Sequence, residues 1–129
     1  MEYLNKKGEK KNVNIKYGGL FAVKAKSKEA YKTFNKYYKI AMKLAVSGDD
    51  SDFEKAIDDV DALDAADIIY AAYICCGYTG DYKRFCEEEI NDDFIYNAEK
   101  AVDLIVGDVE KNASSAKPSN GRRGKASRK

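Results

Sequence analysis

Few side chains in this chain are of the types that commonly carry chemistry. The 129 residues include no histidine, which removes the commonest general base and the commonest zinc ligand. The three cysteines are Cys75, Cys76 and Cys86. Adjacent cysteines on a helix point about 100° apart, so Cys75 and Cys76 are not expected to form a disulfide. An odd count without a CxxC pair predicts small core thiols in a reducing cytoplasm.

The acidic and glycine-containing segments do not match known ligand-binding loops. Asp49, Asp50 and Asp52 lack the alternate spacing, central glycine and final glutamate of a calcium-binding loop. Gly18-Gly19 is expected to form a turn, and the Gly-Tyr-Thr-Gly of residues 77–80 lacks the lysine that follows in a phosphate-binding loop. We therefore expect that the protein is not an enzyme and that it has no catalytic residue, no cofactor and no metal site.

The charges are strongly segregated along the chain. Residues 1–48 hold twelve lysines and three glutamates, a net charge of +9, whereas residues 49–112 carry −14 and residues 113–129 carry +6. This distribution can be intramolecular, with the basic N-terminal part lying over the acidic helices, or it can drive head-to-tail self-association or partner choice. Two functions therefore stay open: a small nucleic-acid-binding or regulatory protein that uses its basic arm and tail, and an acidic inhibitor of a host defence protein. The −14 segment makes nucleic acid the less expected partner.

The element that must position everything else is the apolar run from Ala65 to Cys76. It contains no glycine or proline, its two Ala-Ala pairs favour a helix, and it is shorter than the ~20 residues that span a bilayer. We expect a central helix buried on several sides, with Asp64 as its N-cap and Gly77 as its stop. No membrane partner is expected.

The flanking segments predict a hairpin and further helices. Apolar and polar residues alternate over 12–17 and 20–26 around Gly18-Gly19, which predicts a β-hairpin at 12–26. We expect a mainly α (α+β) fold in which this hairpin packs on a compact bundle of about four to five helices. The predicted boundaries are a flexible basic arm at 1–11, a single globular domain at 12–112, helices at about 28–46, 52–63, 65–76, 81–90 and 92–112, and a disordered basic tail at 113–129.

The order of these elements resembles a known family. The hairpin around Gly18-Gly19, the Asp67-Ile68-Ile69-Tyr70-Ala71-Ala72-Tyr73 helix, the acidic segment from Phe85 to Phe94 and the closing amphipathic helix together resemble the tail assembly chaperones of long-tailed bacteriophages, especially those of Gram-positive hosts. The resemblance covers roughly residues 12–112, and the basic tail has no match in it. It brings no catalytic residues to this chain.

The resemblance implies a role in virion morphogenesis in the cytoplasm of the host bacterium. Such chaperones coat the long tape measure protein, keep it soluble and assist polymerisation of the tail tube protein around it. They commonly come as a short form and a longer frameshifted form, and they are absent from the finished particle. The implied partners are therefore the tape measure protein and the tail tube protein, with self-association as a further possibility.

Aromatic side chains are the best candidates for contacts with such partners. The chain has ten tyrosines, a residue type enriched at interfaces. Those beside lysines in the predicted hairpin and in the 28–46 helix are expected to be exposed. The candidate protein-contact residues are Tyr17, Phe21, Tyr37 and Tyr38.

Overall fold

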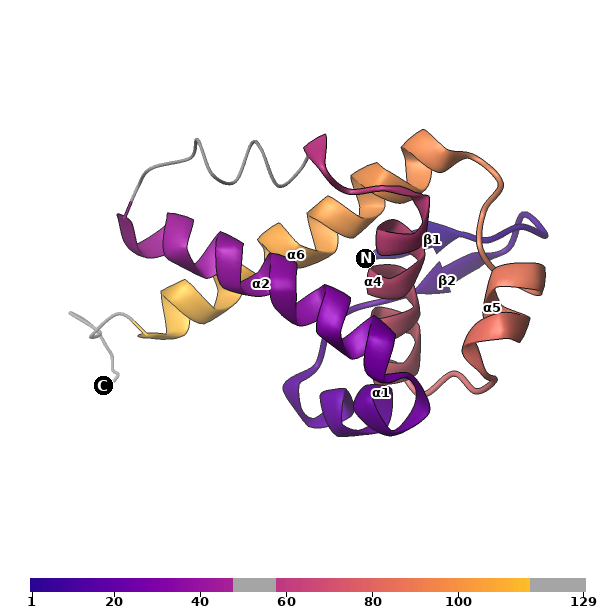
Figure 1. Cartoon of the computed structure of the whole chain (residues 1–129), viewed down its shortest axis with the longest axis horizontal. Coiled ribbons are helices and arrows are strands. Elements are labelled where there is room, and N and C mark those ends of the chain that lie inside the picture. Colours follow the sequence, from indigo (N-terminus) through magenta and orange to yellow (C-terminus); the bar gives the residue numbers. More distant parts are fainter. Residues whose placement is uncertain (48–57, 117–129) are drawn as a thin grey trace.

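The computed structural model describes residues 1–47 and 58–116, and this part of the chain is mainly helical with a short N-terminal hairpin (Figure 1). The expected fold class is confirmed. The elements in chain order are β1 (Glu2–Leu4), β2 (Lys10–Asn12), the 3-10 helix η1 (Tyr17–Gly19), α1 (Leu20–Lys26), α2 (Lys28–Ser47), α4 (Ala62–Cys75), α5 (Tyr82–Glu88) and α6 (Phe94–Ala116).

Helix α4 is the centre of the fold, and every residue from Ala65 to Cys75 in it is buried. It packs against α2, α6 and α1, and Figure 1 shows it between α2 on one side and α6 on the other. The predicted central helix is thus confirmed, but its predicted N-cap is wrong. The side chain of Asp61 accepts the cap hydrogen bond from the Asp64 N–H (2.8 Å), so the helix begins earlier. Gly77 follows the helix with φ 91°, as its stop requires.

The two long helices α2 and α6 form where the apolar periodicity places them. Ser27 caps α2 as predicted, because its Oγ accepts from the Ala30 N–H (3.1 Å). Helix α6 runs on through Gly107 to Ala116, so the predicted tail does not begin at 113, and residues 117–129 lie outside the described residues. Both helices pack on α4 and on each other. Their buried residues include Ala30, Phe34, Tyr37 and Ala41 from α2 and Ala101, Leu104 and Ile105 from α6.

The hairpin predicted at 12–26 is wrong, because the hairpin lies nearer the N-terminus. Strands β1 and β2 pair antiparallel with Tyr3 opposite Lys11, and Gly8 takes φ 81° in the connecting turn. The predicted flexible arm at 1–11 is therefore ordered. Gly19 is instead in right-handed helical conformation (φ −79°, ψ −16°), so the chain enters α1 there. Val23 of α1 is completely buried.

The two predicted helices not yet described are those at 81–90 and 52–63. Helix α5 matches the helix predicted at 81–90, and its N-cap Asp81 accepts from the Arg84 N–H (2.8 Å). The first half of the helix predicted at 52–63 lies outside the described residues, and residues 59–61 are not helical. Among the helices described, none is long and apolar enough to cross a membrane.

Candidate protein-binding surface

The segment before α1 is held tightly against the C-terminal end of α4. The Asn14 N–H donates to the Cys76 Sγ (3.2 Å), and the Cys75 thiol donates to the Lys16 carbonyl (3.4 Å). Gly19 lies so close that a Cβ built on it would be 2.8 Å from the Cys75 Cα and 2.9 Å from its Sγ. Only a residue without a side chain fits this approach. The cysteines thus act here as small packing and hydrogen-bonding groups.

This fixed segment presents two aromatic side chains to solvent. Tyr17 in η1 is 84% exposed and Phe21 in α1 is 77% exposed. They are four residues apart across the continuous η1–α1 helical segment, a spacing that brings side chains to one side. We call Tyr17 and Phe21 the aromatic pair. Both were expected to be exposed, and both are; the expected reason, a hairpin face, is wrong.

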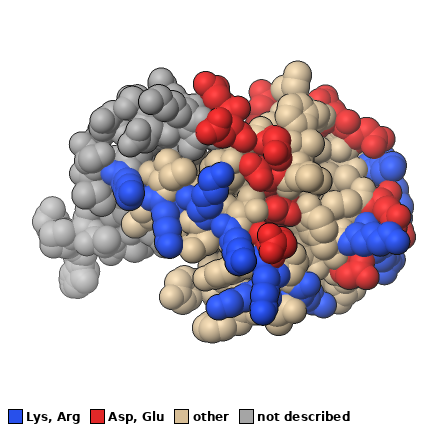
Figure 2. Space-filling view, viewed as in Figure 1, with Lys and Arg blue, Asp and Glu red and all other residues tan. Residues whose placement is uncertain are grey.

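Exposed lysines follow the length of α2. Lys28, Lys32, Lys36, Lys39 and Lys43 are all exposed, and we call them the lysine stripe. At about 100° per residue these positions fall within an arc of about 80° on the helix. Figure 2 shows lysine and arginine side chains in a line that follows α2 across the face of the molecule. The stripe ends close to α1, which α2 follows directly in the chain.

The other two predicted contact residues do not belong to this exposed surface. Tyr37 is buried (4% exposed), and its hydroxyl donates to the Asp64 carboxylate (2.5 Å). Burial, reinforced by this hydrogen bond, raises the pKa of the Tyr37 phenol well above its usual range. Tyr38 is half-buried and stacks on Phe34 with 5.5 Å between ring centroids. The expectation that Tyr37 is an exposed aromatic among lysines is therefore wrong.

A buried carboxylate links three helices behind the lysine stripe. Asp67 of α4 accepts a hydrogen bond from the Thr33 hydroxyl of α2 (2.7 Å) and one from the Tyr82 hydroxyl of α5. Burial raises the pKa of the Asp67 carboxyl above its ordinary value, although both hydrogen bonds act in the opposite direction. Burial also raises the pKa of Tyr82 and of Cys86 beside it. The Tyr82 hydroxyl is thus held in its protonated form as a donor to Asp67, which suits a structural link.

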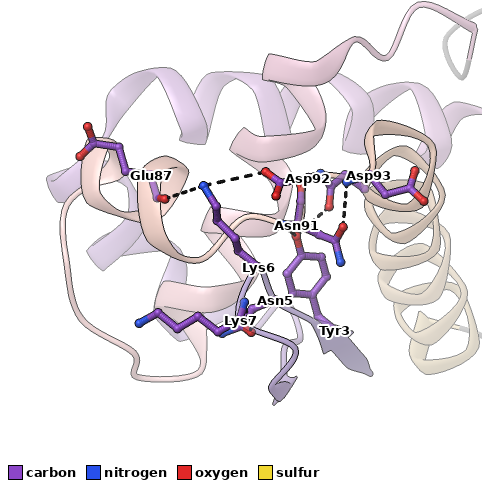
Figure 3. A network of polar contacts seen from close by, with 9 residues as sticks. Tyr3, Asn5, Lys6, Lys7, Glu87, Asn91, Asp92 and Asp93 are labelled. Atoms are coloured by element: carbon purple, nitrogen blue, oxygen red, sulfur yellow. Dashed lines mark hydrogen bonds and ion pairs between the residues drawn. The ribbon is translucent and has the colours of Figure 1, made fainter.

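A second polar network fastens the hairpin to the turn between α5 and α6 (Figure 3). The Tyr3 hydroxyl donates to the Asn97 Oδ1 and accepts from the Asn91 N–H, both at 2.7 Å. Figure 3 also shows Lys6 reaching from the hairpin turn to the Glu87 carbonyl (3.2 Å) and to the Asp92 carboxylate (3.9 Å). This network orders the first residues of the chain, for which the sequence pattern predicts a flexible arm.

Glu89 completes that network on the side of α4. Its Oε1 accepts from the Asn5 amide (2.9 Å) and from the Tyr73 hydroxyl (2.5 Å). Burial raises the pKa of this carboxyl, but the two hydrogen bonds and nearby lysines outweigh it, so the pKa of Glu89 is lowered overall. Glu89 is thus a charged acceptor for the hairpin.

The chemistry available in the described residues is that of donors, acceptors and contact surfaces. No group of three or more candidate metal ligands occurs in this part of the chain. An open groove lies between the Asn14–Lys16 segment and α6, lined in part by Asp103 and Leu104. The arrangement exposes the aromatic pair and the lysine stripe on a rigid support and uses the other polar groups to hold that support together.

Sequence reasoning missed the polar contacts that join distant segments. Nothing in the local sequence of Asp67 indicates Thr33 or Tyr82 as its hydrogen-bond partners. Tyr3 and Asn97 are 94 residues apart, so no periodicity relates them. Leu63 (68% exposed) and Ile95 (67% exposed) are apolar residues at helix starts that the structure leaves at the surface. Comparisons of this chain with known protein families, with curated proteins and with solved structures find no match.

Proposed function

We propose that this protein is a non-enzymatic assembly chaperone that binds a helical partner protein through the aromatic pair. The observation that carries the proposal is the exposure of Tyr17 and Phe21 on a segment that Gly19 and the two α4 cysteines hold in place. Aromatic anchors dominate the energy of most protein interfaces, and a rigid support lowers the entropy lost on binding.

The surroundings of the aromatic pair suit a protein interface. Lys16 just before η1 and Lys24 and Lys26 in α1 are exposed, which gives the apolar centre a charged rim. Interfaces commonly combine an apolar centre with such a polar rim. A partner with an amphipathic helix and acidic flanks would complement it. We therefore propose contact between an apolar stripe of the partner and the aromatic pair.

The specific role that we propose is phage tail assembly, in which the partner is the tape measure protein and the product is a polymerised tail tube. This proposal depends on the resemblance in the order of elements. The corrected position of the hairpin removes the Gly18-Gly19 part of that resemblance, whereas the α4 helix, the acidic segment and the closing helix of it remain. A long helical tape measure protein offers the apolar stripes that the aromatic pair would cover.

The test is co-expression of this chain with the tape measure protein of the same genome. The variant Tyr17→Ala/Phe21→Ala should return the tape measure protein to the insoluble fraction, with a loss of binding free energy of about 2 kcal/mol or more. Phe94→Ala/Ile95→Ala is the matched control, since it also removes two exposed apolar side chains, from the start of α6. Equal solubility with both double variants would contradict the proposal.

A second candidate function is nucleic-acid binding, and the lysine stripe is the observation in its favour. The basic arm on which that reading also depended is a hairpin whose Lys6 contacts Glu87 and Asp92. A gel shift titrated with salt tests this candidate, because phosphate contacts weaken steeply as salt rises. Binding at low salt that Lys36→Glu/Lys39→Glu abolishes would favour it over the chaperone role.

A further inference from the structure

Acidic residues run beside the lysine stripe on the same face of the molecule. Asp58, Asp59 and Asp61 are exposed just before and at the start of α4, Asp64 follows in its first turn, and Glu29 lies at the start of α2. We call these five residues the acidic rim. In Figure 2, acidic side chains lie on the same face above the basic line and approach it most closely near its lower right end. One face thus carries two adjacent bands of opposite charge.

Within residues 1–43 and 58–107, the two bands pair with each other at one point only. The stripe's one ion pair within residues 1–43 and 58–107 joins Lys32 to Glu29 at 4.0 Å, one turn apart on α2. None of the ion pairs in that part of the chain joins the lysine stripe to the aspartates before and in α4. Lys36 is instead 5.0 Å from the centre of the Tyr37 ring. Within the described residues, most members of each band therefore have no ion-pair partner in the other band.

Side-by-side bands of opposite charge are self-complementary under one symmetry. A two-fold axis that lies in the plane of the face and runs along α2 places each lysine stripe opposite the acidic rim of the other copy. A two-fold axis across the bands would place like charge on like charge, which disfavours that arrangement. Closed two-fold dimers with the same patch on both subunits are the commonest oligomers.

We infer that this face binds a second copy of the chain in a two-fold dimer, in which α2 of one copy lies over the acidic rim of the other. Leu63, 68% exposed within the acidic rim, supplies an apolar contact for the hydrocarbon stems of the partner's lysines. The inference does not depend on the proposed chaperone function, because the aromatic pair belongs to α1 and η1 rather than to these bands.

The interface should respond strongly to salt. Exposed charges act over a Debye length of about 10 Å at 0.1 M salt but only about 3 Å at 1 M. The dimer should therefore predominate at low salt and dissociate as salt rises, whereas an apolar interface would keep or gain affinity. Sedimentation equilibrium across this salt range measures the dissociation constant of the purified full chain directly.

Charge reversal with rescue tests the inference. Lys36→Glu/Lys39→Glu and Asp58→Lys/Asp59→Lys should each raise the dissociation constant by at least about tenfold, because like charges then face each other. An equimolar mixture of the two variants should regain dimers, since each supplies the band that the other needs. Lys10→Glu/Lys83→Glu is the control: it changes net charge as much as the first variant does, at exposed sites in β2 and α5.

Three outcomes would overturn the inference. The first is a monomer at low salt for the unaltered chain. The second is a dimer that the control weakens as much as the stripe variant does, or that the mixture fails to restore. The third is a stripe that binds a short DNA duplex while the protein stays monomeric, which would assign the lysines to a polyanion. Circular dichroism verifies that each variant is folded.

Discussion

The contact between Gly19 and α4 gives the sharpest test of how the aromatic pair is held. Gly19→Ala adds a methyl group whose carbon would lie 2.8 Å from the Cys75 Cα and 2.9 Å from its Sγ. The Cα is backbone at the end of the buried central helix, so it cannot rotate out of the way. The segment from η1 into α1 must therefore shift away from α4.

The magnitude follows from two opposing effects. Overpacking a closely packed site typically costs about 1–3 kcal/mol. Gly19 has ordinary helical angles (φ −79°), so alanine should otherwise gain about 0.4–1 kcal/mol through the less flexible unfolded chain. We expect a net loss of about 1–2 kcal/mol in the free energy of unfolding. The shift should also loosen the support of Tyr17, which lies two residues earlier.

Gly18→Ala is the matched control, because nothing lies within 4 Å of a Cβ built on Gly18. Urea unfolding followed by circular dichroism measures both variants. Gly18→Ala should unfold at the same urea concentration as the unaltered chain or at a slightly higher one, and Gly19→Ala at a clearly lower one. Equal midpoints for the two variants would refute the proposed close contact.

Three further predictions concern polar groups that are buried or half-buried. Tyr3→Phe should lower the free energy of unfolding by about 1–3 kcal/mol in urea titrations, because the buried Asn97 Oδ1 and Asn91 N–H lose their partner. Asp67 has a raised pKa in the folded protein, so its contribution to the free energy of unfolding is greatest below its ordinary pKa of 3.8 and is lost as pH rises through the folded pKa. The Asp67→Asn variant should therefore gain stability relative to the unaltered chain as pH rises over that range. Glu89 has a lowered pKa in the folded protein, so its contribution to the free energy of unfolding is present above pH 4.5 and is lost as pH falls through the folded pKa. The difference in urea midpoint between Glu89→Gln and the unaltered chain should therefore shrink on acidification. For Asp67→Asn the change with pH has the opposite sign.

The helices could be predicted because their apolar periodicity extends over many turns. Residues 28–46 and 65–76 are nearly the observed α2 and α4. The orientation of α2 was harder, because two apolar stripes overlap on it. Ala30, Phe34, Tyr37 and Ala41 face the core, whereas the neighbouring stripe through Tyr38 is only half-buried. The buried stripe contains two small alanines, so its apolar pattern is weaker than that of the neighbouring stripe. Tyr37 was therefore predicted to be exposed.

The hairpin was misplaced because short segments carry too little local information. Strands of three residues, such as Glu2–Leu4, show no measurable alternation, whereas residues 20–26 alternate by chance. Gly18-Gly19 can start a helix as well as turn a hairpin, and the contact with Cys75 selects the helix here. The candidate surface was therefore half predictable: Tyr17 and Phe21 are exposed, but what supports them depends on long-range packing.

The bonds from Tyr3 to the start of α6 also set an order of events during synthesis. Tyr3 leaves the ribosome long before its partner Asn97, which is 94 residues later in the chain. The nascent hairpin must therefore wait, unpaired with its final neighbours, while α2 and α4 are made, and contacts of such long sequence separation slow folding. Until α6 is synthesised, Tyr3 and the side of α4 that α6 covers stay exposed, so the nascent chain would itself benefit from a chaperone.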